Sequence, residues 1–474
     1  MLKRTRSFLV LVMLLMTVTM SAQVTTATMS GKVTAQDEPI IGATIVAIHE
    51  PSGTRYGTVT NVSGQFNLQG MRTGGPYKVE ISYVGYQTAI YKGINLLLGE
   101  NYVLNVSLKE SSELLDEVVV TASKESNMKS DRAGAIMNAN RDMISNTPTI
   151  SRSISDIMRL SPQGADVGNG FAVGGGNYRQ SFVTVDGAAF NNTFGLGGNL
   201  PANGSPISLD ALEQVTVAVT PFDVRQSGFT GGAINAVTRS GDNQFRGTAY
   251  MYFNNENLKG SKVDDYELLR SKAQYYTYGA SFGGPIIKDK LFFFVNGEYE
   301  DNVTAGSNYR PRTALGESYS GGNIHRPLQS DMDDMRGFLL NKYNFDPGKY
   351  NDYSTDTPAY RVMARVDWNA NQNNKVSFRF TKTHTKDSNF PTSSVSPLST
   401  SALYPGGTST EVIDGKPVGT IAPGQGRTSK YALSFSNSNY YQVRDFTSVA
   451  GEWNSRMAQG AMNNMLRFAY SYQD

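Results

Sequence analysis

The C-terminal half of the sequence alternates apolar and polar residues with a period of two. Residues 361–368 place two valines, an alanine and Trp368 on one face, and two arginines and an aspartate on the other. Residues 291–299 and 375–381 repeat this pattern. A two-residue period indicates strands with one apolar and one polar face. We expect about seven such strands, near residues 244–253, 274–282, 291–300, 360–368, 375–383, 444–453 and 464–473.

The connections between these segments alternate in length. Those near 283–290, 369–374 and 454–463 are short, whereas 301–359 and 384–430 are long and polar. Antiparallel sheets of soluble proteins also alternate, but this loop rhythm is typical of outer-membrane β-barrels, which have short periplasmic turns and longer extracellular loops. Closed single-chain barrels usually have an even strand number. The odd number here predicts that the sequence is the N-terminal part of a larger protein.

Before residue 110 the apolar runs are short and are separated by Gly, Pro and Asn turns. Regularly spaced short strands are typical of a small β-sandwich. We expect its strands near residues 40–48, 56–60, 65–68, 77–84 and 102–108.

The segment between this sandwich and the alternating strands mixes helix and strand signals. Residues 146–160 have the apolar spacing of a short amphipathic helix that ends at Ser161 and Pro162. The Gly-rich stretch 164–205 lacks both nucleotide-binding glycine patterns, so we interpret its glycines as turns. Further strands are expected at 181–185, 212–217 and 228–238.

Residues 1–22 have the features of a cleaved export signal. Three basic residues precede the apolar run 8–16, and Ser21 and Ala22 form a small-residue cleavage site before Gln23. The apolar run is too short to span a membrane. Export therefore directs the chain to the periplasm, the outer membrane or the extracellular space.

Composition narrows the class of protein further. The 474 residues have a charged fraction of 18% and a mean hydropathy of -0.36, which is too polar for a bundle of membrane helices. With 43 basic and 41 acidic residues, the chain lacks the basic surplus of nucleic-acid-binding proteins. The absence of cysteine excludes disulfides, thiolate metal sites and a cysteine nucleophile.

The sequence offers little catalytic chemistry. His49, His325 and His384 lie far apart and form no metal-binding spacing. The acidic run from Asp331 to Asp334 supplies carboxylates of the kind that Ca²⁺ binds, but without EF-hand spacing we interpret it as a solvated loop. We predict no catalytic residue, no metal site and no cofactor, and hence that the protein is not an enzyme.

Several motifs follow one another in a fixed order. The N-terminal part contains Gly31-Lys32-Val33 and 60–66 (TNVSGQF). Four more follow it, namely 155–162 (SDIMRLSP), 183–187 (VTVDG), 212–217 (LEQVTV) and 231–239 (GGAINAVTR). In this order the sequence resembles the TonB-dependent outer-membrane receptors that carry an N-terminal carboxypeptidase-regulatory-like domain. Residues 221–229 are similar to the Oar-like branch, and the whole resembles Oar-like or SusC-like receptors.

The resemblance implies a mainly β protein with a transthyretin-like β-sandwich, an α+β plug domain and the first about seven strands of a transmembrane antiparallel β-barrel, which has about 22 strands in complete transporters. The implied domains are a signal peptide at 1–22, the regulatory-like sandwich at 23–110, a linker at 111–128, the plug at 129–241 and a partial barrel at 242–474.

The linker contains one strand-forming run in acidic surroundings, which resembles the TonB box. An extended segment can add to the edge of a partner's sheet, where backbone hydrogen bonds supply the affinity. An ordinary linker strand is the alternative. The resemblance implies that the segment binding TonB comprises Asp116, Glu117, Val118, Val119, Val120, Thr121 and Ala122.

Residues that contact a ligand are expected in the Gly- and Asn-rich loops of the plug. The alternative is that these residues only satisfy turns. Arg239 is expected to pair with a carboxylate of the barrel wall instead of a ligand. The ligand candidates are Asn169, Asn177, Tyr178, Arg179, Asn191 and Asn192.

The resulting hypothesis is an outer-membrane transporter that imports an extracellular ligand with energy relayed by TonB of the TonB-ExbB-ExbD complex. The sequence leaves open whether the ligand is a siderophore, cobalamin, a glycan, a peptide or a protein, and whether a surface lipoprotein is a further partner. Outer-membrane lipid is expected around the barrel, and no nucleic acid is expected as a partner. The alternatives are an adhesion or secretion-associated barrel without active import, and a soluble exported binding protein.

Overall fold

A computed structural model describes residues 24–110, 118–121, 136–149, 152–168, 170–192, 198–219, 229–258, 260, 262–264, 266–267, 272–307, 309–319, 323–389, 412–413, 416–417, 433–457 and 462–474. The predicted export signal, residues 221–228, Asp116, Glu117, Ala122 and Asn169 lie outside the described residues.

The N-terminal region forms two five-stranded sheets whose apolar faces pack together. Alternate residues of each strand are buried, and the core includes Met29, Ile45, Leu68 and Tyr77. One sheet contains β1 (Ala27–Ala35), β2 (Glu38–Pro39), β5 (Gln65–Met71), β8 (Asn101–Val103) and β9 (Val106–Ser107). The other has the order β10 (Val118–Thr121), β7 (Ala89–Leu96), β6 (Gly74–Ser82), β3 (Thr44–His49) and β4 (Thr54–Val59).

Two of these strands, β1 and β7, are absent from the sequence prediction. In β1 the buried positions are held by alanines as well as Met29 and Val33, so the segment has no conspicuous apolar run. In β7 the alternation is interrupted at Lys92 and Gly93, which are both exposed. Tertiary pairing, which the local pattern does not reveal, completes both strands.

The middle region is built around one mixed sheet. Its order is β11 (Ile136–Ala139), β16 (Leu212–Ala218), β17 (Ala233–Thr238), β14 (Phe182–Val185) and β15 (Ala188–Ala189). Strand β17 is buried at all its positions, as expected for a strand covered on both faces. Around the sheet lie α2 (Arg141–Asn146), α3 (Ile154–Met158), β12 (Gly164–Asp166), β13 (Phe171–Val173), η1 (Tyr178–Gln180), η2 (Ala202–Gly204) and η3 (Leu209–Ala211).

The single helix predicted over residues 146–160 is wrong in its extent. The structure has two shorter helices, α2 and α3, with Thr147 and Pro148 between them. Asn140 caps the start of α2, and Ser153 and Asp156 form a capping box at the start of α3. Proline disfavours the helical conformation of the residue before it, which separates the two helices.

The C-terminal region is a wall of seven long antiparallel strands at the positions that the alternation predicts. Each strand pairs with its neighbour in the sequence of long strands, and β25 (Ser354–Asp356) adds to β22. The order is β18 (Arg246–Asn255), β21 (Gln274–Ile287), β22 (Leu291–Ala305), β26 (Ala359–Asn369), β27 (Asn374–Asn389), β30 (Tyr440–Met457) and β31 (Met462–Gln473).

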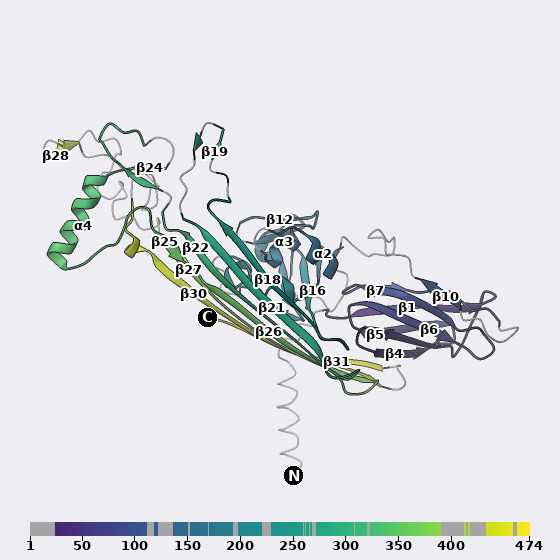
Figure 1. Cartoon of the computed structure of the whole chain (residues 1–474). Coiled ribbons are helices and arrows are strands. Elements are labelled where there is room, and N and C mark those ends of the chain that lie inside the picture. The colour runs from purple at the N-terminus through teal and green to yellow at the C-terminus, as the bar shows by residue number, and fades with distance from the viewer. Residues whose placement is uncertain are drawn as a thin grey trace, which may run out of the picture.

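The long connections carry structure of their own at one end of the wall (Figure 1). Helix α4 (Gln329–Tyr343) is absent from the prediction because its surface is mostly exposed and has no apolar stripe. Among the described residues, no helix is long and apolar enough to cross a membrane. The remaining short elements are β19 (Lys262–Val263), β20 (Tyr266–Glu267), β23 (Arg310–Arg312), β24 (Ile324–Leu328), β28 (Val412–Ile413), β29 (Lys416–Pro417) and η4 (Ser436–Ser438).

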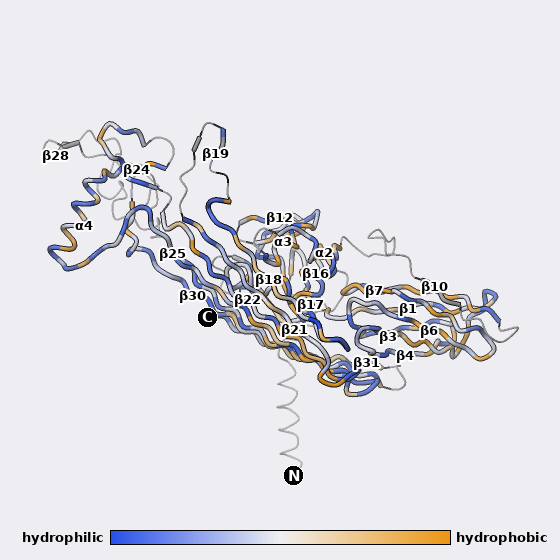
Figure 2. Tube along the Cα trace, in the orientation of Figure 1, coloured by the Kyte–Doolittle hydropathy of each residue, from blue (hydrophilic) through white to orange (hydrophobic). Residues whose placement is uncertain are grey.

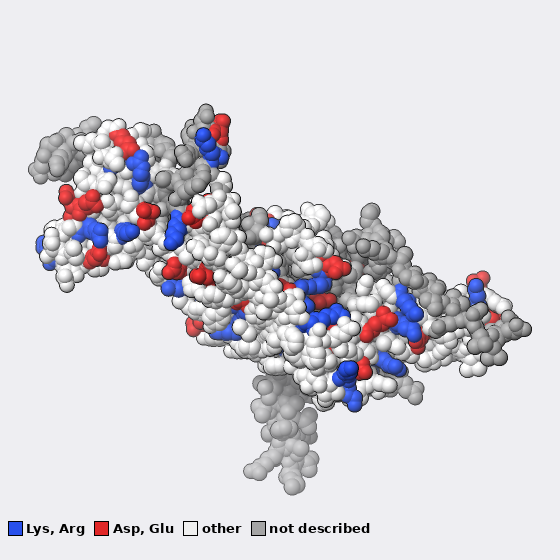
Figure 3. All heavy atoms as spheres, in the orientation of Figure 1, with Lys and Arg blue, Asp and Glu red and all other residues white. Residues whose placement is uncertain are grey.

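The three regions occupy distinct places along the wall. The middle sheet lies against one face of the strands, and the N-terminal sandwich lies beside their short-turn end (Figure 1). Apolar residues concentrate in the part of the wall nearer those turns (Figure 2). Charged side chains gather over the loops near α4 and where the sandwich meets the rest of the molecule (Figure 3). The sandwich therefore sits at the end opposite the long loops.

Candidate functional site

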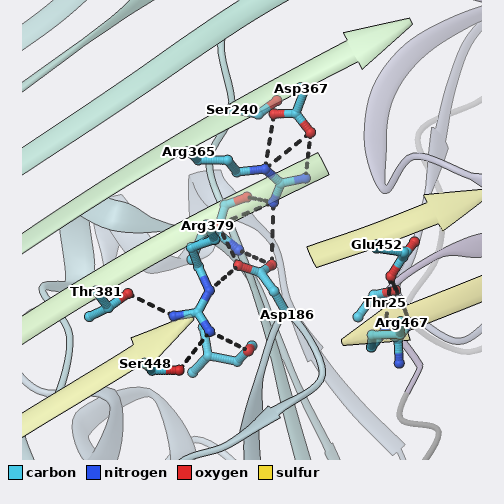
Figure 4. A network of polar contacts seen from close by, with 12 residues as sticks. Thr25, Asp186, Ser240, Arg365, Asp367, Arg379, Thr381, Ser448, Glu452 and Arg467 are labelled. Atoms are coloured by element: carbon cyan, nitrogen blue, oxygen red, sulfur yellow. Dashed lines mark hydrogen bonds and ion pairs between the residues drawn. The ribbon is translucent and has the colours of Figure 1, made fainter. Parts of the chain in front are cut away.

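The middle region contacts the wall through a charged residue placed by a tight turn. Asp186 and Gly187 connect β14 to β15, and both have positive φ, 47° and 76°. Two residues with positive φ form a type I′ hairpin turn, for which Asp-Gly is a preferred pair. The turn projects the Asp186 carboxylate towards strands β26 and β27 (Figure 4).

Two arginines of the wall form ion pairs with this carboxylate. Asp186 Oδ1 lies 3.3 Å from Arg365 Nη1, and Oδ2 lies 3.0 Å from Arg379 Nε, as an ion-pair contact without the alignment of a hydrogen bond. Thr238 donates to the same carboxylate from its backbone N–H at 3.0 Å and from its hydroxyl at 2.7 Å. Arg365 also pairs with Asp367 at 2.9 Å. These two Asp and two Arg side chains form a closed, charge-balanced group.

Arg379 is the most enclosed member, with 2% of its surface exposed. It donates to Thr381 at 2.7 Å and Ser448 at 3.1 Å on the wall, and to the carbonyl of Val185 at 3.2 Å on β14 (Figure 4). Its guanidinium carbon lies 5.2 Å from the centre of the Phe190 ring. That ring packs edge-on against Phe446, with ring centres 4.7 Å apart. A buried charge is tolerated only when it is paired and hydrogen-bonded, and here it is both.

A second cluster surrounds Asp210. Its carboxylate accepts from Arg141 at 2.7 Å and from the wall hydroxyl of Thr248 at 2.9 Å. Burial opposes ionisation of Asp210, but the hydroxyl of Ser281 and the guanidinium groups of Arg141 and Arg239 outweigh burial and hold its pKa below the usual value. The carboxylate is therefore kept charged against the wall.

The prediction that Arg239 pairs with a carboxylate of the barrel wall is wrong. Its carboxylate partner is Asp210 of η3, at 3.3 Å. Arg239 reaches the wall through the hydroxyl of Ser281, at 3.3 Å, and its guanidinium lies over the ring of Phe294 at 4.7 Å. η3 leads into β16, which pairs with β17, and this pairing places Asp210 beside Arg239. Sequence spacing does not reveal this contact.

A third set of contacts lies nearer the loops. Glu298 accepts from Ser208 at 2.9 Å and from Tyr250 at 2.6 Å, and it pairs with Arg361 at 3.0 Å. Arg361 also donates to the carbonyl of Ser205 at 2.6 Å. Because Ser205 and Ser208 belong to the middle region and the other three to the wall, this cluster fastens the two together.

The N-terminal sandwich is attached to the turn end of the wall. Asn369 donates to Thr54 at 2.9 Å, and Lys375 lies over the ring of Tyr56 at 3.0 Å. On another strand pair, Arg467 donates to Glu452 at 2.7 Å and both contact the hydroxyl of Thr25 (Figure 4). Residues from all three regions line a cavity of about 270 Å³ at this junction.

A hydrogen-bonded chain connects the sandwich core to the wall. His49 Nδ1 lies 2.7 Å from the hydroxyl of Ser52, which lies 2.7 Å from that of Thr54, the partner of Asn369. Burial, followed by the positive charges of Arg72 and Lys375, holds the pKa of His49 well below 6.5. The imidazole is therefore neutral in the folded state.

Acidification should weaken the sandwich through His49. Below pH 6.5 the unfolded chain binds a proton that the folded state does not, so stability falls as pH falls. One such group lowers the free energy of unfolding by about 1.4 kcal/mol at pH 5.5 relative to pH 7.5. Hydrogen exchange of β3 and β4 peptides, corrected for intrinsic rates, should be about tenfold faster at pH 5.5 by this contribution. The exchange rates of His49→Gln should lack this tenfold increase. The same pH dependence in this variant as in the wild type would show that His49 is not the group responsible.

Three of the predicted ligand residues make local contacts. Asn177 accepts from the N–H of Arg179 at 3.0 Å, which caps η1. Asn191 accepts from Val183 at 2.6 Å and donates to Ser181, and Asn192 donates to Gly198 at 3.2 Å. These contacts support turns, as the alternative interpretation expects.

The other two candidates lie next to each other on η1. Arg179 is exposed, and its Nε donates to the Tyr178 hydroxyl at 3.0 Å. Contact between these two side chains and a ligand stays a prediction. Asn169 lies outside the described residues.

Part of the proposed TonB-binding segment is described. Residues 118–121 form β10, which pairs in parallel with β7 of the sandwich in the register Val118 with Ala89 and Thr121 with Lys92. The segment is thus an edge strand of a five-stranded sheet. This pairing has no signal in the local sequence.

Within the part of the chain that the structure describes, no group of three or more His, Asp or Glu side chains could hold a metal ion. The predicted solvated loop at Asp331, Asp333 and Asp334 is instead part of α4. The carboxylate of Asp333 accepts from the hydroxyl of Tyr350 at 2.7 Å.

Sequence reasoning placed Arg361, Arg365 and Asp367 on the polar face of a strand without assigning them a role. In the structure they face the middle region, together with Arg379 and Glu298. Their charge was the signal that could have identified them, because on a strand with one apolar face the charged residues must lie on the other face. Their partners in the middle region could not be identified in this way.

Comparisons with known families divide the chain in two. Residues 28–109 match the carboxypeptidase regulatory-like domain. Residues 237–419 match the outer membrane beta barrel domain. The matched ranges cover the N-terminal sandwich and most of the wall.

Two characterised proteins are similar in sequence. The TonB-dependent transporter Oar of Myxococcus xanthus is 27% identical over 256 residues, which are 52% of this chain and 22% of that protein. The TonB-dependent receptor SusC of Bacteroides thetaiotaomicron is 29% identical over 269 residues, 54% of this chain and 24% of that protein. The alignments thus span less than a quarter of either relative. Both relatives are named as a TonB-dependent transporter or receptor, in agreement with the prediction that the chain is not an enzyme.

Solved structures that are similar to this chain include the siderophore receptor PirA from Acinetobacter baumannii. The two are 14% identical, with a TM-score of 0.42 over 72% of this chain and 40% of that chain. The outer membrane transporter YddB from Escherichia coli aligns with a TM-score of 0.43 at 11% identity, over 72% of this chain and 38% of that chain.

Proposed function

Because the chain belongs to the TonB-dependent receptors of the outer membrane, with an N-terminal carboxypeptidase regulatory-like domain, we propose that it imports an extracellular ligand with energy relayed by TonB. The family and the outer-membrane location predicted from the motifs are confirmed. The proposal concerns import, the partner and the domain boundaries at residues 22, 110, 128 and 241.

One observation carries the proposal: the middle region, the plug, is fastened to the wall by buried polar contacts around Asp186, Asp210 and Glu298. An apolar interface would exchange its contacts for water at a large cost in free energy. Charged and hydroxyl groups recover hydrogen bonds to water when they separate. Polar contacts of this kind suit a plug that must move within the barrel during transport and stay in place at rest.

The direction of force follows from the chain path. The TonB-binding segment precedes the plug in the sequence. Its strand β10 belongs to the sandwich, which lies beside the short turns and opposite the long loops. Tension on this segment would act on the plug from its turn side. The opposite side of the plug is then the side of ligand entry. Tyr178 and Arg179 of η1 precede β14, whose other end leads to Asp186, and this supports these two of the six predicted residues as ligand contacts.

The test is deletion of Leu115–Ala122 from the receptor in cells. Labelled ferric siderophore, cobalamin and oligosaccharide serve as probes, because the ligand class is open. We expect at least one probe to accumulate in wild-type cells, while the variant accumulates it only as well as cells lacking the receptor and still binds it at the surface. Deletion of residues 123–130 shortens the tether equally and should preserve uptake.

Energised uptake that survives loss of Leu115–Ala122 would contradict the mechanism. It would favour the second candidate, an adhesion or secretion-associated barrel, whose long outer loops with α4 need no energy coupling.

A further inference from the structure

The two edges of one sandwich sheet have different occupants. The edge strand β4 contacts the wall through Thr54 and Tyr56. The backbone of Arg55 on the same strand accepts from Lys375 at 3.3 Å. At the opposite side of the same sheet, β10 pairs with β7 and forms the other edge. One edge is therefore fixed to the barrel and the other holds the coupling segment.

This arrangement sets the position of the coupling segment. Four strand spacings separate β4 from β10, which amounts to about 19 Å at the spacing of hydrogen-bonded strands. Figure 1 shows β10 on the part of the sandwich away from the short turns. The segment thus lies at the edge of this sheet opposite to the edge that contacts the wall.

The pairing also occupies backbone groups that a partner would need. A strand that adds to a partner's sheet binds mainly through main-chain N–H and C=O groups. In β10 one row of these groups is directed to β7 over Val118–Thr121. A partner that requires the whole segment in an extended form must compete for it.

We propose that the N-terminal domain is an intramolecular strand acceptor, which sequesters the TonB-binding segment on its β7 edge until a partner displaces it. The inference rests on the proposed function, because it concerns the same segment. Only seven residues, 111–117, separate the end of the sandwich from β10. So short a tether gives the segment a local concentration in the millimolar range at its own domain.

Displacement is within reach because the docked strand is short. Four paired residues form a marginal contact compared with the usual strand of about five or six. On the other side, residues 122–135 lie between β10 and β11, a length that extends to about 48 Å. The segment can therefore leave β7 without moving the plug.

The experiment traps the docked state by cross-linking. The chain contains no cysteine, so Lys92→Cys with Thr121→Cys introduces one pair of thiols at facing positions of β7 and β10. A short bis-methanethiosulfonate reagent, which dithiothreitol reverses, joins them. The probe is the purified periplasmic domain of TonB, and the measurement is its dissociation constant for the whole receptor in detergent.

We expect the cross-linked receptor to bind the probe at least tenfold more weakly than the wild type, and reduction to restore wild-type binding. Thr44→Cys with Val59→Cys joins two exposed, facing positions of β3 and β4 and should leave binding unchanged. Absence of cross-linking between residues 92 and 121, or undiminished binding after it, would overturn the inference. Absence of binding by the wild type and the reduced variant would instead refute the proposed function.

Discussion

Replacing Asp186 by Asn should loosen the plug from the barrel wall by about 3 kcal/mol. The substitution keeps the shape of the side chain and removes its charge. Arg365 would keep its pairing with Asp367, but Arg379 would lose the carboxylate with which it pairs, which leaves one buried positive charge uncompensated. Removing one partner of a buried ion pair is costly because the other charge stays desolvated.

Asn is the informative replacement because of the turn. Asp186 has a φ of 47°, a left-handed conformation that Asn and Asp adopt more readily than other non-glycine residues. Alanine at this position would add backbone strain to the loss of charge. An effect of Asp186→Asn therefore reports on the ion pairs and not on the hairpin.

Hydrogen exchange measures the loosening directly. In Asp186→Asn, amides of β14 and β17 should exchange roughly a hundredfold faster, while those of the sandwich strands stay unchanged. The double variant Asp186→Asn with Arg379→Gln should recover part of the protection, because the charge that was left alone is also removed.

A matched control lies in the loops. Asp346 pairs with Arg336 at 3.1 Å, and both side chains are about half exposed. Exposed pairs are screened by water and contribute little, so Asp346→Asn should change exchange by less than about twofold. Equal effects of the two substitutions would show that the Asp186 network does not hold the plug.

How far the sequence could predict this molecule depends on the range of the interactions involved. The wall strands were readable because alternation is a local consequence of having one apolar and one polar face. The Asp-Gly pair at 186–187 follows the strand expected at 181–185 and is also a local signal, because both residues of such a turn need positive φ. The partners of Asp186 were not, because Arg365 and Arg379 lie more than 170 residues away along the chain.

Other differences have the same origin. Helix α4 has no apolar stripe to identify it. The strand-forming run of the linker was predicted, but its pairing with β7 was not, because β7 lies in another part of the chain. Arg239 was predicted to pair with a carboxylate of the wall, but it pairs with Asp210 of the middle region. Local patterns thus gave the elements, and the contacts between distant elements determined the site.

Replacing Gly31 by Ala should destabilise the N-terminal domain by about 3 kcal/mol. Gly31 lies in β1, beside the two residues that connect β8 to β9. A Cβ atom there would lie 1.8 Å from the carbonyl oxygen of Leu104 and 2.9 Å from the ring of Phe66. The first contact is with backbone that pairs with β1, since Leu104 donates to Ser30 at 2.8 Å. Relief of the clash must therefore separate β1 from β8 and β9.

The comparison with Gly57→Ala isolates this steric effect. Gly57 lies in β4, is exposed, and would place its Cβ 3.7 Å from the nearest carbonyl oxygen, an ordinary contact. Its replacement should change stability by less than about 0.5 kcal/mol. Exchange of β1 and β5 amides in the whole receptor should be more than a hundredfold faster in Gly31→Ala only. If the domain also holds the coupling segment, the same variant should bind the periplasmic domain of TonB more tightly, because a loosened sandwich retains β10 less well. Unchanged exchange in Gly31→Ala would mean that β8 and β9 do not constrain β1.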